Sequence, residues 1–551
     1  MSEFKENKSE HSLLENNQSR SKQLEAFNHP CQLEQLPTEL LTRILSELDQ
    51  ATLSRCAQLN KRWRQLTAQP LLWRNSIRIR AQTIIDSPTP VNQLSYWTSF
   101  CSSASIQQLH FELCSSDAEY NRRSVQLLNT FLSNSPCLQA LTIQGFDGLP
   151  TEEQNPLVVL GQSCSQLCTL KLIRFGRDLL TEESVTALNE GCLELVDLEF
   201  RQSVLAGPDS NPLPLPQLAS LFSRLTRLNF LHEATFPLFL DEMVDGTSIR
   251  ELVLNASDLC YDEHLHRLLS LAPYLTTLKL QFGEFTESHA GPLASGCPNL
   301  QSLVLKNVSL CMISATGFVE LLNGCPKLRR LKISSHDELD SECYRKIVAN
   351  LPSGIEDLKL PSFRKLRQPD LQSLLPRGLK RFELPIQELK HGCMRGLLVG
   401  LRPCSDLTSL NISDCDDKLL SDLLTLLSRL RRLRLTNCIR LSGKVWENLL
   451  KRGATQPLPE LHEFAALKFS DASLNDEFVA ELCRTPVARG LRRLELSDCR
   501  SLTDSALVSI AGACPHLTDL KLSGLQFDNF ANGLDQFLNS YRGRRVRVHS
   551  D

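Results

Sequence analysis

Residues 499–525 read CRSLTDSALVSIAGACPHLTDLKLSGL and define the pattern of the chain. The stretch ends on the spacing L-x-x-L-x-L, carried by Leu517, Leu520 and Leu522. Such alternation predicts a short strand, because successive strand side chains point to opposite faces. The preceding run from Thr503 to Ala513 is predicted as a helix. One strand and one helix therefore make up each unit of this sequence.

The same spacing recurs sixteen times between Ile106 and Leu517, at a mean interval of about 27 residues, inside the leucine-rich-repeat range. Parallel strands stack about 4.8 Å apart, whereas helices need roughly 10 Å. An array with one strand and one helix in every repeat must therefore curve. We predict an α/β fold, a curved leucine-rich-repeat solenoid over 106–528 with parallel strands on the concave face and helices on the convex face. The register of one repeat stays open. Phe464 fits the first position of the L-x-x-L-x-L template, but it also fits the second position if Leu461 is the first.

Composition limits the other possibilities. The chain has 551 residues, 42% of them apolar, and a formal net charge of −3. This near balance gives no basic field for nucleic acid, and no apolar run approaches the roughly 20 residues that cross a membrane. Residues 1–30 are polar and predicted to be disordered. The start has no apolar signal-peptide core, so we expect a reducing compartment, cytoplasmic or nuclear, with free thiols.

The cysteines follow the repeat. Six of the 20 precede the first template residue by three. They are Cys164, Cys192, Cys297, Cys325, Cys404 and Cys514. Repeat-locked spacing predicts packing, because a buried cysteine behaves as a small apolar side chain. No C-x-x-C pair and no common nucleophile, phosphate-loop or metalloprotease motif occurs. We therefore predict no metal, no cofactor and no enzymatic activity.

A second pattern lies upstream, where residues 36–73 read LPTELLTRILSELDQATLSRCAQLNKRWRQLTAQPLLW. Leucines and an isoleucine recur at helical spacing after Pro37, and two further short helices are expected. A segment of about 45 residues cannot enclose two tryptophans and some ten large aliphatic side chains. An apolar patch should therefore remain for a protein partner. The alternative is that this patch packs only on the first repeats.

The order and spacing of L-P-x-E-L-L-x-x-I-L-x-x-L-D, K-R-W-R and P-L-L-W resemble an F-box over its full length. One departure is Gln50, where the family often has proline. Together with the cysteine-containing repeats, the chain resembles the F-box and leucine-rich-repeat (FBXL) class. The expected domains are an F-box at 33–78, which the resemblance implies, a connecting helical segment at 79–105, and, after the solenoid, a C-terminal cap at 529–551, whose charged strand residues suit a sheet edge.

The resemblance implies that the F-box binds the Skp adaptor and, through it, cullin and RING subunits of an SCF-type ubiquitin ligase. Leu41, Leu66 and Trp73 are expected in the core of the module. The residues expected at the adaptor interface are Leu36, Pro37, Leu40, Ile44, Leu45, Leu48, Leu53 and Trp63. The alternative is a protein-interaction scaffold outside any ligase, resembling ribonuclease inhibitor.

A substrate protein would contact the concave face. Residues flanking the last two template positions point into it because strand side chains alternate. The basic residues expected there are Lys279, Lys306, Arg330, Lys332, Lys359, Arg381, Arg432 and Arg434. They predict a groove for an acidic or phosphorylated peptide, since arginine pairs well with carboxylate and phosphate. The alternative is that they are ordinary solvated side chains.

Overall fold

The computed structural model describes residues 36–85, 106–203, 214–231, 240–384, 395–446, 461–467, 474–523, 537 and 547–550, with gaps of one to four residues in several ranges. The described residues form two compact units, the first ending at Leu195 and the second beginning at Val196. The segment 1–30, Trp73, and most of 86–105 and 529–551 lie outside the described residues.

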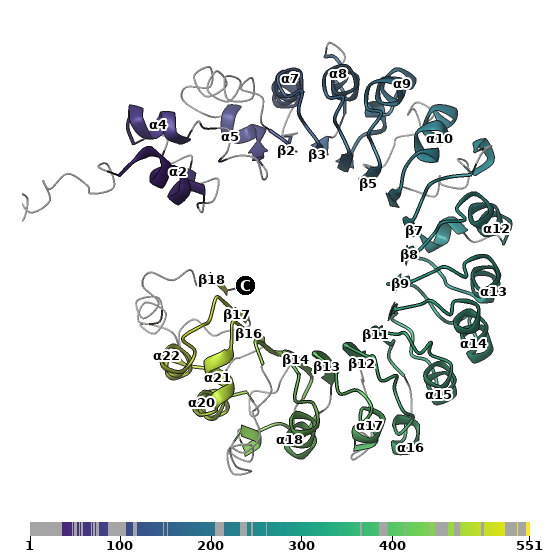
Figure 1. Cartoon of the computed structure of the whole chain (residues 1–551), viewed down its shortest axis with the longest axis vertical. Helices are drawn as coiled ribbons and strands as arrows, with labels where there is room; N and C mark the ends of the chain where they lie inside the picture. The colour runs from purple at the N-terminus through teal and green to yellow at the C-terminus, as the bar shows by residue number, and fades with distance from the viewer. Residues whose placement is uncertain are drawn as a thin grey trace, which may run out of the picture. The chain divides into compact units, whose positions relative to one another are not determined.

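In the first unit, two short helices precede an alternation of strands and helices (Figure 1). The bounds are α2 Thr38–Ser46, α4 Lys61–Thr67, β1 Ile77–Arg80, α5 Ala81–Ile85, β2 Gln108–Glu112, α7 Ala118–Ser133, β3 Ala140–Phe146, α8 Pro156–Ser163, β4 Thr169–Phe175 and α9 Glu182–Gly191. Strands β1 to β4 pair in parallel and in chain order. The helices that join parallel strands must cross over one face of the sheet.

The sheet begins earlier than the leucine spacing predicted. Strand β1 pairs with β2, placing Ile77 beside Leu109 and Ile79 beside Phe111. Both isoleucines are buried, so β1 supplies the second and third template positions of a further repeat. The first template position would be Arg74, and the L-x-x-L-x-L search missed the strand for that reason.

The second unit continues the same alternation, with strands along the inner side of an arc and helices along its outer side (Figure 1). Its strands are β5 Asp197–Ser203, β6 Arg227–Leu231, β7 Glu251–Asn255, β8 Thr277–Gln281, β9 Ser302–Lys306, β10 Arg330–Ser334, β11 Asp357–Lys359, β12 Arg381–Leu384, β13 Ser409–Ser413, β14 Arg432–Thr436, β15 Glu463–Leu467, β16 Arg493–Ser497, β17 Asp519–Ser523 and β18 Arg547–Ser550. Its helices are α10 Leu215–Ser223, α12 Asp262–Leu271, α13 Glu287–Gly296, α14 Ala315–Gly324, α15 Ser341–Ala349, α16 Gln368–Leu371, α17 Arg395–Gly400, α18 Asp417–Leu426, α20 Asp476–Arg484, α21 Pro486–Gly490 and α22 Asp504–Ala513.

Register in this unit confirms the repeat. Every strand pairs in parallel with the next in the chain, so template residues align across the sheet. Phe464 lies beside Leu433 and Leu494, which are second template positions. The register that begins at Leu461 is therefore correct, and the one that begins at Phe464 is wrong. The buried template side chains form the core between strands and helices.

The repeat-locked cysteines pack as predicted. All six are buried, and five of them end a helix as its C-cap, with the backbone N–H donating to the carbonyl four residues earlier. The Cys192 thiol also donates to the Cys164 carbonyl, Sγ to O 3.5 Å, one repeat away. Burial raises the pKa of Cys164 and of Cys297 to about 12. These thiols therefore stay protonated and structural.

Candidate functional site

The first candidate surface is the two-helix module of α2 and α4. Leu41 and Leu45 of α2 are buried, as are Trp63 and Leu66 of α4. The Arg62 guanidinium donates to the Leu36 carbonyl, Nη2 to O 3.0 Å, and joins α4 to the chain ahead of α2. These contacts give the module a small core of its own, and they confirm Leu41 and Leu66 as core residues.

The other side of α2 is apolar and exposed. The side chains of Leu40 and Ile44 are 49% and 43% exposed, and their spacing of four residues places them on one helical face. Pro37 is exposed, while Leu36 and Leu48 are half-buried. Leu45, Leu53 and Trp63, which the family resemblance placed at the adaptor interface, lie inside the module. The apolar pattern therefore divides into a buried stripe and an exposed stripe.

The second candidate surface is the concave face of the second unit. The eight basic residues predicted there lie on β8 to β12 and on β14, at half-buried or exposed positions. Six of them form ion pairs with carboxylates of neighbouring strands. The other two, Lys279 and Lys306, have no described carboxylate oxygen within 4.0 Å of their ammonium nitrogens. Most of these cations are therefore both paired with a carboxylate and partly exposed to solvent.

Asp357 is the centre of one group of ion pairs. It is only 4% exposed, and its Oδ2 atom lies 3.3 Å from Arg330, 3.1 Å from Lys332 and 3.0 Å from Arg381. The strand register causes this arrangement, since Arg330, Asp357 and Arg381 lie side by side on β10, β11 and β12. Beside this group, Lys359 pairs one-to-one with Glu383, Nζ to Oε1 2.6 Å.

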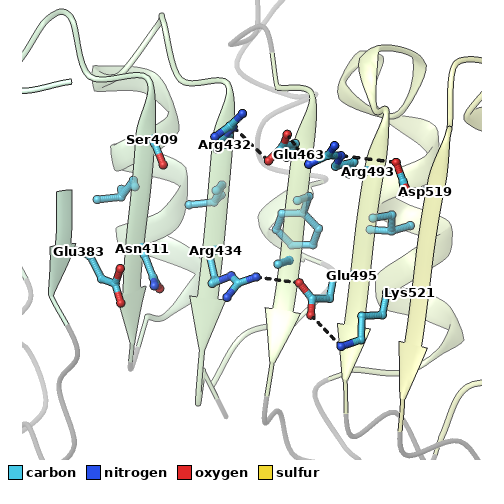
Figure 2. Close-up of a pocket in the computed structure, with 15 residues that line it drawn as sticks. Glu383, Ser409, Asn411, Arg432, Arg434, Glu463, Arg493, Glu495, Asp519 and Lys521 are labelled. Carbon is cyan, nitrogen blue, oxygen red and sulfur yellow. Dashed lines mark hydrogen bonds and ion pairs between the residues drawn. The ribbon is translucent and has the colours of Figure 1, made fainter. Parts of the chain in front are cut away.

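Further along the sheet, charges alternate in two rows (Figure 2). In one row Glu463 lies between Arg432 at 3.0 Å and Arg493 at 3.5 Å, and Arg493 also reaches Asp519 at 3.5 Å. We call the two rows on β14 to β17 the ion-pair ladder. In this first row the opposite charges lie on adjacent strands, where they stabilise the pairing of those strands.

The second row of the ladder depends on a small residue. Arg434 of β14 donates to Glu495 of β16, Nη2 to Oε2 2.8 Å, across the intervening strand β15 (Figure 2). Between them in register lies Ala465, whose methyl side chain is too short to obstruct the contact. Glu495 also pairs with Lys521, Oε1 to Nζ 3.7 Å. The rows border a hollow of about 590 Å³ with buried apolar side chains such as Phe464 in its floor.

Sequence reasoning missed the carboxylates Asp357, Glu463 and Asp519. Each stands immediately before the second template residue, in the column that also holds Arg330, Arg381, Arg432 and Arg493. Only the basic members of that column entered the prediction. The alternation of sign over β14 to β17 becomes apparent only with the register that begins at Leu461, because the register that begins at Phe464 puts Ala466 in this column.

Among the described residues, no three His, Cys, Asp or Glu side chains gather closely enough to hold a metal ion. A search of the same residues finds no helix with the length and apolar character required to cross a membrane.

Comparison with known proteins gives one family match and several similar folds. Residues 33–78 match the family model described as F-box-like. No curated protein matches the chain significantly.

Three solved structures are similar to the chain. One is from the Rad7 and Elc1 complex in yeast, 13% identical over 98% of this chain and 97% of that chain, with a TM-score of 0.35. The second is the leucine-rich repeat-containing protein LegL7 from Legionella pneumophila, 14% identical over 59% and 98%, TM-score 0.33. The third is from the TLR13–ssRNA13 complex, 12% identical over 88% and 62%, TM-score 0.33. The leucine-rich-repeat assignment rests on the strand register described above.

Proposed function

We propose that this chain, an F-box-like domain joined to a leucine-rich-repeat solenoid, is the substrate-recognition adaptor of an SCF-type cullin-RING ubiquitin ligase. The F-box-like domain would bind the Skp adaptor, and the concave face would bind the substrate protein. The chain would be non-catalytic, with ubiquitin transfer carried out by the other subunits in the cytoplasm or nucleus. The observation that carries the proposal is the exposed pair Leu40 and Ile44 within the F-box-like match.

The proposed adaptor interface consists of the exposed and half-buried residues of the module. Exposed aliphatic side chains on one helical face are typical of a helix that docks on a partner. Leu45, Leu53 and Trp63 would act indirectly, because their burial holds α2 and α4 together. The proposed contact residues are Leu36, Pro37, Leu40, Ile44 and Leu48.

Substitution of the exposed pair tests the proposal. Leu40→Ser with Ile44→Ser should abolish co-purification of the Skp adaptor while the thermal midpoint stays unchanged, because both side chains are exposed. Val508→Ser is the matched control, since Val508 is an exposed apolar residue on α22. Trp63→Ala should instead lower both stability and adaptor binding, as a buried tryptophan contributes about 3–5 kcal/mol.

Two outcomes would reject or replace the proposal. If the folded double variant recovers the Skp adaptor at the wild-type yield, Leu40 and Ile44 do not form the adaptor interface. Recovery of the adaptor without any cullin would favour the alternative, an interaction scaffold outside the ligase.

A further inference from the structure

Charge is unevenly divided along the concave face of the second unit. The strands β8 to β12 carry six cations and two carboxylates, an excess of four positive charges. The strands β13 to β17 carry four cations and three carboxylates, an excess of one. The whole chain has a net charge of −3, so this local excess runs against the overall balance. We call the concave residues of β8 to β12 the cationic segment.

The cations of this segment are only partly satisfied within the described residues. Arg330, Lys332 and Arg381 share one oxygen of Asp357, and that oxygen accepts no well-aligned hydrogen bond. Lys279 and Lys306 have no carboxylate oxygen of the described residues within 4.0 Å, although the more distant charges of Glu199 and Glu251 act on Lys279. Their N–H groups therefore remain available to an incoming anion, and such charge-assisted hydrogen bonds are the strong ones.

An exposed aromatic side chain borders the same segment. Phe282 follows β8, is 52% exposed, and donates its backbone N–H to the Lys306 carbonyl at 3.1 Å. Its φ of +53° lies in the left-handed region, which a bulky side chain rarely adopts. Asn307 and Asn437 have the same conformation just after β9 and β14, and asparagine tolerates it well.

The backbone requires this conformation whichever side chain is present. Gly283 follows with φ +88°, and a Cβ there would lie 2.6 Å from the Ser257 backbone nitrogen. The turn is thus tightly packed, and an asparagine at position 282 would fit it with less strain. A strained and exposed phenylalanine contributes little to the fold, which points to a binding role.

We propose that the cationic segment, together with Phe282, binds an acidic segment of a protein in an extended conformation. Carboxylates, or phosphorylated serines, would contact the cations, and one apolar side chain would pack on Phe282. Four strand intervals span roughly 19 Å, which about six extended residues cover. This inference rests on the proposed function only in identifying that protein as the ligase substrate.

A protein segment fits this surface better than nucleic acid does. Single-stranded nucleic acid is bound on successive aromatic side chains over a basic groove. In the described part of β8 to β12, the aromatic side chain Phe382 is buried, and Phe282 is the exposed aromatic residue at the margin. One aromatic anchor beside several cations suits a short acidic and apolar peptide.

A phage-displayed library of random octapeptides, selected on the purified full-length chain, tests the inference without the Skp adaptor. The wild-type chain should enrich peptides with several Asp or Glu residues and one large apolar residue. The variant Lys279→Glu with Lys306→Glu should bind the best selected peptide roughly tenfold more weakly or worse, a loss of about 1.4 kcal/mol. Lys418→Glu, at an exposed position on α18, is the matched charge control and should bind normally.

Phe282→Asn separates the apolar anchor from the charges. This variant should keep the acidic preference, lose the apolar preference, and keep or raise its thermal midpoint, because asparagine suits the backbone. Exchange of one Glu of the selected peptide for phosphoserine shows whether carboxylate or phosphate is preferred, and both results fit the proposal.

Enrichment of peptides without acidic residues would overturn the inference. Equal binding by the double variant and the Lys418→Glu control would also overturn it. A single-stranded oligonucleotide that binds more tightly than the peptide and loses affinity in the double variant would replace the protein partner by nucleic acid. Since the adaptor is absent from this assay, failure of the F-box proposal leaves its outcome unaffected.

Discussion

The cationic segment on β8 to β12 and the ion-pair ladder on β14 to β17 are built from the same repeat but differ in how their charges are paired. Apart from Lys306, which lies one position further along its strand face, both place their charges in the same two columns of the concave face. In the ladder, Glu463 lies between Arg432 and Arg493, Glu495 lies between Arg434 and Lys521, and Asp519 pairs with Arg493. In the cationic segment, the Asp357 carboxylate serves three cations, and two lysines form no ion pair within the part of the chain that the structure describes. The repeat thus fixes where charges stand, while single residues decide whether they neutralise one another.

The two regions also differ in their cores. Behind the ladder, Trp446 packs edge-to-face on Phe464 and Phe478, with ring centroids 5.6 and 5.8 Å apart. Behind the cationic segment the corresponding aromatic contact is between Tyr344 and Phe363, 5.2 Å apart. The tryptophan with two phenylalanines around it is thus particular to the ladder region, whereas the cationic segment has separate ring pairs.

Removal of that cluster should have the largest effect. Trp446→Ala should lower the free energy of unfolding by about 3–5 kcal/mol, because it leaves a large cavity. Hydrogen exchange should rise mainly in β14 to β17, since repeats contact only their neighbours. Tyr344→Phe is the contrasting change in the other region: its buried hydroxyl has no hydrogen-bond partner in the described part of the chain, so stability should be unchanged or improved.

The second prediction concerns buried carboxylates. Asp258 is buried and neither of its oxygens accepts a well-aligned hydrogen bond within the described residues, whereas Asp357 has three cations. Burial raises the pKa of Asp258 to about 7, while the Asn255 backbone opposes the rise. Between about pH 4 and pH 7, Asp258 therefore keeps its proton in the folded chain, whereas in the unfolded chain it has already lost it.

The contribution of Asp258 to the free energy of unfolding should consequently be greatest below pH 4. It should fall as the pH rises, by up to about 1.4 kcal/mol per pH unit. Asp258→Asn should flatten this dependence between pH 5 and 7 and be more stable than wild type at pH 8. Thermal midpoints measured across that range check the prediction. A variant with the slope of wild type would show that Asp258 is charged at neutral pH.

The third-largest effect is expected from removing the Asp357 carboxylate, which three cations share. Asp357→Asn leaves three neighbouring cations without their counterion and should cost about 2 kcal/mol, below the 3–5 kcal/mol of a fully buried pair. Chemical denaturation by urea at low salt measures this cost, and added salt should reduce it. Glu463→Gln, the equivalent change in the ladder, should cost less than about 1 kcal/mol because its carboxylate is more exposed. Equal costs would remove the contrast between the regions.

The smallest effect is expected for the bridge over Ala465. A double-mutant cycle on Arg434→Ala and Glu495→Ala should give a coupling of about 0.2–1 kcal/mol, typical of exposed pairs. Introducing Ala465→Leu should abolish the coupling by placing a side chain between the partners. A coupling that survives this change would mean that the arginine reaches its partner by another route.

Leucine periodicity was enough to predict the solenoid, because buried template positions leave a regular trace in the sequence. It failed at β1, where Arg74 occupies the first template position, and left Phe464 ambiguous, because an aromatic residue fits either position. The F-box stripe was visible, but helical spacing alone could not separate Leu45 from Leu40, because both lie within one apolar arc. The ion pairs of Asp357 depend on contacts between repeats, and the exposure of Phe282 depends on its backbone conformation. The periodicity of the sequence predicts neither feature.

The helix-ending cysteines also supply a set of chemical reporters along the array. The buried thiols of Cys164, Cys192 and Cys325 are each protected by their own repeat and, through contact with a carbonyl of the preceding repeat, by the neighbouring one. An alkylating reagent can therefore reach one of these cysteines only when two adjacent repeats separate. Labelling rates at Cys164, Cys192 and Cys325 would then map, position by position, where the solenoid opens first.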